Sequence, residues 1–89
     1  PIPQILDFRP DPAAVVAGDP VSLCFQTVDA SYVLIESESD KSTDFKLNPT
    51  KDCVTVYPYE TRTQYTLHVF NENGEEGKPW TVEVLVGPG

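Results

Sequence analysis

Basic side chains are scarce in this chain, whose 89 residues contain 6 lysines and arginines against 14 aspartates and glutamates. The formal charge of −8 would repel a phosphate backbone, because nucleic-acid binding depends on basic groups that release counterions. Anionic membrane surfaces are disfavoured for the same reason, and no apolar run approaches the roughly 20 residues needed to span a bilayer. We therefore expect neither a nucleic-acid partner nor insertion into a membrane.

Side chains that carry out catalysis are equally few. His68 is the only histidine, and it lies between two residues that should face inward, so it should lie on the outer face of a strand. A nucleophile needs a base within hydrogen-bond reach, and the chain has neither a glycine-rich phosphate loop nor a metal-binding histidine pair. The sequence predicts a domain that is not an enzyme and that carries no cofactor or metal.

Acidic residues in the expected loops raise one specific metal hypothesis, calcium. Carboxylate oxygens are the ligands that calcium prefers, but the chain lacks the alternating Asp and Asn residues of an EF-hand loop. The alternative, which we favour, is that these carboxylates are solvated surface charge. The residues concerned are Asp11, Asp29, Asp40, Asp44, Glu72, Glu75 and Glu76.

The length allows one domain with one core, which we place over residues 1–89. Nine prolines and five glycines separate short runs rich in Val, Thr, Tyr and Ile. Turn signals recur about every ten residues, a spacing that favours a sandwich or a barrel. The runs alternate with period two and prolines interrupt anything longer, so helix content should be near zero.

Seven strands follow from the alternating runs. For the strand at 31–36 the pattern leaves two possibilities, with either Val33 and Ile35 or Tyr32 and Leu34 facing inward. The expected ranges are 4–8, with Val15 and Val16 as a possible second segment, 21–27, 31–36, a short strand at Phe45 and Leu47, 52–57, 64–71 and 79–86. The residues expected to face one interior are Val21, Leu23, Phe25, Val54, Val56, Tyr65, Leu67, Val69, Trp80, Val82, Val84 and Val86.

The segment between the last two strands carries a turn signal, Asn73-Gly74, because both residues tolerate positive φ. We expect a hairpin connection there, inside a loop at 71–77.

Two segments carry a family resemblance. Residues 58–67 read Pro-Tyr-Glu-Thr-Arg-Thr-Gln-Tyr-Thr-Leu, and residues 3–8 read Pro-Gln-Ile-Leu-Asp-Phe, with Pro12, Gly18 and the run 21–25 after them. They resemble the E-to-F and A-to-B segments of bacterial immunoglobulin-like and fibronectin type III-like modules. The resemblance spans nearly the whole chain and implies a seven-stranded antiparallel Greek-key sandwich. The chain departs from the family at Phe25, where tryptophan is common, and lacks the cysteine pair of antibody domains.

The two cysteines, Cys24 and Cys53, are an even number, which outside the cytosol suggests a disulfide. Both should point outward on strands that are neighbours in one sheet of such a fold, where opposed residues lie about 4.5 to 5.5 Å apart. Closing a loop of about 30 residues would stabilise the fold by roughly 3.5 kcal/mol in the chain-entropy account. Two free thiols are the alternative. A disulfide predicts an extracytoplasmic protein, either secreted, on the cell surface or periplasmic.

The resemblance also gives Tyr65 a structural role. In sandwiches of this kind a tyrosine near the start of the sixth strand turns its hydroxyl back to a main-chain group a few residues upstream, the tyrosine corner. Such a hydrogen bond is worth about 1 kcal/mol net. We therefore expect Tyr65 to be structural and not a ligand contact.

The outer face of one sheet is the candidate binding patch. If Val33 and Ile35 face the core, several large apolar side chains point outward beside the only histidine, as at a docking surface. The alternative is that a neighbouring domain, a second copy or a loop covers them. The residues are Tyr32, Leu34, His68, Phe70 and Leu85.

The function that these features predict is a non-catalytic structural or interaction module, a spacer or a protein-docking domain of a secreted, surface or envelope multidomain protein. Its partners would be neighbouring domains or another protein. The alternative is a carbohydrate-binding or enzyme-accessory module, in which Tyr32, Phe70, Tyr57 or Tyr59 stacks on sugar rings. We expect the chain to be excised from a longer protein, with a complete small protein as the alternative.

Overall fold

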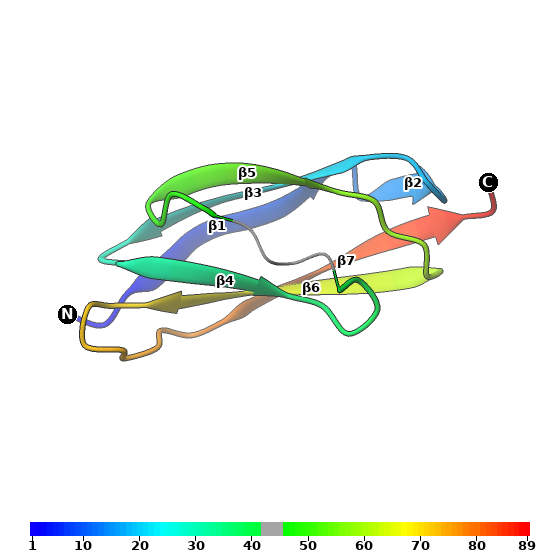
Figure 1. Cartoon of the computed structure of the whole chain (residues 1–89). Helices are drawn as coiled ribbons and strands as arrows, with labels where there is room; N and C mark the ends of the chain where they lie inside the picture. Colours follow the sequence, from blue (N-terminus) through cyan, green and yellow to red (C-terminus); the bar gives the residue numbers. More distant parts are fainter. Residues whose placement is uncertain (42–45) are drawn as a thin grey trace.

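The computed structural model describes residues 1–41 and 46–89, and within these ranges all regular structure is β-strand. The strands form two packed sheets, one of three strands and one of four (Figure 1). The domain is elongated, with extents of 44 × 20 × 19 Å. The expectation of an all-β chain without helix is confirmed for the described residues.

The first sheet has the order β1-β3-β5 and the second the order β2-β7-β6-β4. Neighbouring strands are antiparallel except β2 and β7, which are parallel. The bounds in the first sheet are β1 (Gln4–Asp11), β3 (Val21–Val28) and β5 (Lys51–Val56). Those in the second are β2 (Ala14–Val16), β7 (Trp80–Gly87), β6 (Arg62–Phe70) and β4 (Tyr32–Glu36).

The chain crosses between the sheets early, directly after β1. This strand continues through Pro10 to Asp11, three residues beyond its predicted end; it is an edge strand, where proline is tolerated. The Asp11–Pro12 peptide bond is cis, and the next residues form β2 in the other sheet. The possible second segment at Val15 and Val16 is therefore confirmed.

The predicted short strand at Phe45 and Leu47 has a different outcome. Phe45 lies outside the described residues, and Leu47 is not in a strand, although it packs against the core. Proline two residues later, at position 49, limits how far a strand could continue here. The described residues thus form seven strands because β2 is one of them, and not because of a strand at Phe45 and Leu47.

Alternation along the strands places the core as predicted. In β4 it is Val33 and Ile35 that face inward, while Tyr32 and Leu34 face solvent. Trp80 is the exception: it pairs with the buried Leu67, but it stands at the start of β7 and is 37% exposed. The buried cluster consists of Phe8, Val21, Leu23, Phe25, Ile35, Val56, Tyr65, Leu67, Val69, Val84 and Val86, with Val54 and Val82 partly buried against it.

Candidate functional site

An aromatic pair stands at one end of the outer face of β4 and β6. Tyr32, the first residue of β4, lies directly opposite Phe70, the last residue of β6. Their rings are stacked, with centroids 4.6 Å apart and planes 10° apart; opposed side chains on paired strands lie close enough for this contact. Leu34 follows on the same face. We call Tyr32 and Phe70, together with the adjoining aliphatic Leu34, the aromatic cluster.

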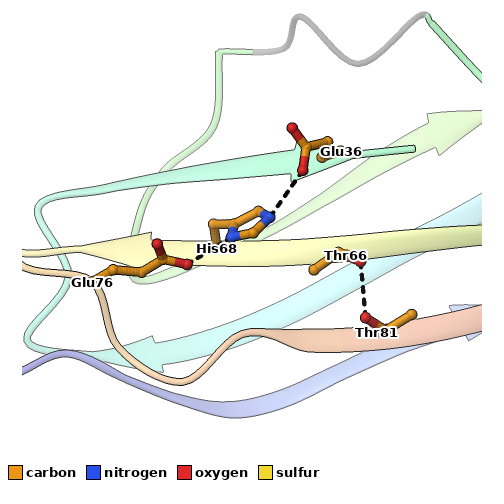
Figure 2. A network of polar contacts seen from close by, with 5 residues as sticks. All are labelled: Glu36, Thr66, His68, Glu76 and Thr81. Carbon is orange, nitrogen blue, oxygen red and sulfur yellow. Dashed lines mark hydrogen bonds and ion pairs between the residues drawn. The ribbon is translucent and has the colours of Figure 1, made fainter. Parts of the chain in front are cut away.

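His68 lies beside this cluster and contacts two carboxylates (Figure 2). Its Nδ1 atom is 2.7 Å from Oε2 of Glu76, and its Nε2 atom is 3.2 Å from Oε1 of Glu36. Glu36 ends β4, whereas Glu76 comes from the loop between β6 and β7. The histidine thus connects an edge strand, a central strand and a loop.

The number of protons on the imidazole ring decides whether both contacts are hydrogen bonds. A carboxylate only accepts hydrogen bonds, so each nitrogen of His68 must carry a proton if both contacts are hydrogen bonds. A neutral imidazole has one donor nitrogen and one acceptor nitrogen. In the neutral ring, therefore, either Glu36 or Glu76 faces an acceptor and lacks a donor from His68.

The buried side chain of Asn71 holds the loop that positions Glu76. Its Oδ1 atom accepts the main-chain N–H groups of Asn73 and Glu75, at 3.0 and 2.9 Å. Its Nδ2 atom donates to Oε1 of Glu75, at 2.9 Å, and to the Pro1 carbonyl, at 3.2 Å.

Gly74 takes a φ of 80° in this loop, which confirms the turn signal. The connection runs over residues 71–79, so it is longer than a tight two-residue hairpin. It returns the chain to β6, where Glu76 pairs with Phe70 in an isolated bridge.

The next polar contact on this face joins the hydroxyls of Thr66 and Thr81, 2.8 Å apart (Figure 2). Neither hydroxyl contacts His68; within the described ranges no hydroxyl or thiol is hydrogen-bonded to the imidazole. A nucleophile activated by a histidine requires that contact. The arrangement joins one imidazole to two carboxylates.

No group of three or more His, Cys, Asp or Glu side chains in residues 1–41 and 46–89 is placed to hold a metal ion. Glu36 and Glu76 approach opposite nitrogens of the imidazole, so they do not converge on one point. Of the residues in the calcium hypothesis, Asp44 lies outside the described part of the chain. The described part also has no helix long and apolar enough to cross a membrane.

Leu85 is separated from the rest of the predicted patch. It faces outward, as expected, but it pairs with Arg62, at the far end of β6 from Phe70. The eight residue-to-residue steps from Arg62 to Phe70 correspond to roughly 27 Å of strand. The structure therefore brings Tyr32, Leu34, His68 and Phe70 together and leaves Leu85 at the opposite end of the sheet. The antiparallel pairing of β6 with β7, which the expected hairpin implies and alternation alone does not, decides this.

Tyr65 is fully buried, but its hydroxyl does not form the hydrogen bond of the predicted tyrosine corner. It donates to Oδ2 of Asp40, 2.6 Å away and 25 residues upstream, instead of to a nearby main-chain group. The nearby carbonyl of Glu60 accepts instead from the Thr63 hydroxyl, at 2.9 Å. Burial, followed by the hydrogen bond to Asp40 and its negative charge, raises the pKa of Tyr65 far above its ordinary value. The expected structural role is retained with a different acceptor.

The predicted disulfide is present between Cys24 and Cys53. The two residues are directly opposed on β3 and β5, with Cα atoms 4.1 Å apart. Both lie on the outer face of the three-stranded sheet, and neither thiol is free. A bridge of this kind is consistent with an oxidising, extracytoplasmic compartment.

The remaining aromatic candidates lie away from the aromatic cluster. Tyr57 and Tyr59 follow β5, in the connection to β6. That connection adjoins the start of β6, whereas Phe70 ends the strand. Tyr59 is 74% exposed, the highest exposure among the large apolar side chains of the described residues. The four candidates for sugar stacking therefore do not share one surface.

Comparison with known proteins assigns no family. No protein-family model matches the chain, and no curated protein and no solved structure is significantly similar to it.

Glu36 and Glu76 are the two site residues that the sequence analysis did not single out for the patch. Glu36 had a readable signal, because it follows Tyr32 and Leu34 at period two and must share their face. Glu76 had none, because its position depends on the loop built around Asn71.

Proposed function

We propose that this chain is a non-catalytic spacer module of a multidomain extracytoplasmic protein. One observation carries the proposal: the first and last residues lie at opposite ends of the long axis of the domain (Figure 1). Polypeptide joined to the two ends would be held apart by the length of the domain, whose longest extent is 44 Å. Two packed sheets sharing one core would keep that separation fixed.

The fold that we propose is the immunoglobulin-like or fibronectin type III-like Greek-key sandwich. The sheet order supports it, since β1, β3 and β5 correspond to strands A, B and E, and β4, β6 and β7 to strands C, F and G. The division of the opening strand into β1 and β2, one in each sheet, fits the same scheme. The disulfide supports a location outside the cytosol. The engagement of both His68 nitrogens by carboxylates supports a non-catalytic role.

The width of the end-to-end distance distribution tests the spacer role better than its mean. A flexible linker of 89 residues would have a root-mean-square end-to-end distance of roughly 50 Å, close to the length of the domain. A flexible chain samples a broad range about that value, whereas a folded spacer holds one distance.

The experiment is a pulsed electron spin resonance measurement with spin labels at Gln4 and Leu85, introduced through non-natural amino acids so that the disulfide is kept. Both side chains are exposed, and they lie toward opposite ends of the domain. We expect one narrow distance peak in buffer. The same chain in guanidinium, and a Gly/Ser linker with equally spaced labels, serve as the broad controls. A native distribution as broad as these controls would contradict the spacer role.

A carbohydrate-binding or enzyme-accessory module remains the second candidate, favoured by the exposure of Tyr59 and Tyr32. A glycan array separates the two proposals. The spacer predicts no hits. A glycan that binds the protein and is lost on Tyr59→Ala or Tyr32→Ala, with unchanged melting, would favour the alternative.

A further inference from the structure

We propose that the outer face of β4 and β6 docks a protein segment that carries arginine, through the aromatic cluster and the carboxylates of Glu36 and Glu76. This proposal goes beyond the spacer role and does not depend on it, because a domain can hold its ends apart with or without a partner on its face.

The apolar part of this face is accessible to solvent. Tyr32 is 51% exposed and Leu34 is 43% exposed, although both stand in a paired strand and not in a loop. The stacking of Tyr32 on Phe70 fixes the tyrosine ring, so little side-chain freedom remains to be lost on binding. Aromatic side chains held in this way are the usual anchors of protein interfaces.

Charge complementarity indicates the chemistry of the partner. Glu36 and Glu76 border the aromatic cluster from two sides, and Glu76 pairs directly with Phe70. The basic side chains that line a hollow with Glu36 are Lys41 and Arg62. Arg62 lies at the far end of β6 from Phe70 and contacts Glu83 at 3.4 Å, so Glu76 is the carboxylate at the aromatic end. A positively charged segment would therefore be attracted to the aromatic end of the face.

Arginine fits better than lysine because a carboxylate, Glu76, and an aromatic ring, Phe70, are neighbours here. A guanidinium group donates through a planar fork to a carboxylate and also stacks on aromatic rings. Bound at Glu76, it could satisfy the carboxylate and lie against Phe70. An ammonium group supplies the charge without the planar fork.

A second copy of the chain is a poorer occupant of the same face. Self-association through a twofold axis would bring Glu36 and Glu76 of one molecule toward the same residues of the other. Each molecule carries a formal charge of −8, so like charges would oppose the contact.

The test is selection from a random 12-residue peptide library displayed on phage, against the immobilised protein. Enriched sequences are then made as fluorescent peptides, and their affinity is measured by anisotropy against variants. Two variants probe the face, Tyr32→Ala and the double change Glu36→Gln with Glu76→Gln. The matched control, Asp19→Asn with Glu60→Gln, removes the same charge from exposed positions outside the face. Thermal melting of each variant checks that it is folded.

We expect enriched peptides to contain excess arginine together with an apolar residue. Their binding should weaken about tenfold or more in both face variants, because Tyr32→Ala removes an aromatic anchor and the double change removes charge-assisted contacts. It should be nearly unchanged in the control. Three results would overturn the proposal. The library could yield nothing, the control could weaken binding as much as the face variants, or the peptides could depend on Tyr32 without excess arginine.

The last of these results would leave a docking face with a different partner. A glycan that binds the face in place of peptides would also overturn the proposal. None of these results bears on the spin-label distance, so failure here and failure of the spacer role are distinguishable.

Discussion

The Tyr65→Phe variant tests the contact between the core and the chain that follows β4. The change keeps the buried ring and removes only the hydroxyl, which donates to Oδ2 of Asp40 at 2.6 Å. Hydrogen bonds to charged groups contribute about 1.5 to 3 kcal/mol net. Asp40 is partly exposed, so water can solvate its carboxylate after the change. We therefore expect a loss near the lower end, about 1.5 kcal/mol.

The assay is urea unfolding with the disulfide intact, followed by the fluorescence of the single tryptophan, Trp80. For a domain of this size a loss of 1.5 kcal/mol corresponds to a fall in melting temperature of roughly 6 to 12 °C. A loss below about 0.5 kcal/mol would refute the reasoning, because it would fall below the contribution of even an ordinary uncharged hydrogen bond.

A second measurement follows from the raised pKa of Tyr65. In the unfolded chain this phenol ionises near pH 10, whereas burial and Asp40 keep it protonated in the folded state. Above pH 10 the unfolded state thus binds fewer protons, so stability falls as the pH rises. The free-energy difference between wild type and Tyr65→Phe should shrink between pH 10 and 11. A difference that stays constant from pH 8 to 11 would contradict the assignment.

Three further perturbations test other parts of the fold. Replacing Cys24 and Cys53 with serine should lower the free energy of unfolding by roughly 3.5 kcal/mol; in wild type, alkylation without reductant should leave the intact mass unchanged. Gly77→Ala should prevent native folding, because an added Cβ would lie 2.0 Å from a backbone oxygen of the N-terminal segment, whereas Gly74→Ala meets no atom and should cost about 1 kcal/mol; circular dichroism and melting compare them. Main-chain N–H groups lower the pKa of the Asp52 carboxyl, so its stabilisation should be present above pH 3.8, its ordinary pKa, and lost as the pH falls further. An NMR titration that gives Asp52 an ordinary pKa would count against this.

The core was the most predictable part of the molecule, because it depends on a local property of the sequence. A strand has a side-chain period of two, so the inward set in β3 could be read from Leu23 and Phe25 alone. The disulfide was predictable for the same reason, since Cys24 and Cys53 share the outward phase of neighbouring strands. Even the uncertain strand, β4, left only two alternatives, and the burial of Ile35 decides between them.

Positions along the strands depend on pairing and not on alternation. Alternation gave the face of Leu85 correctly, and the predicted hairpin at 71–77 already implied a place opposite the start of β6, far from Phe70. Partners on distant segments were less predictable: the acceptor of Tyr65 is 25 residues away on a segment without regular structure. No local pattern specifies such a partner.

The candidate site combines both kinds of information. Tyr32, Leu34 and Glu36 share a face through alternation within one strand, which the sequence shows. Glu76 reaches that face only because Asn71 holds the loop in a conformation that returns the chain to Phe70. Of the two carboxylates beside the aromatic cluster, Glu36 is therefore placed by local alternation and Glu76 by tertiary contacts. Asn71→Ala should then weaken arginine-peptide binding, measured by anisotropy, without touching the binding face, and Asn71→Asp should not rescue it, because the new carboxylate would oppose that of Glu75.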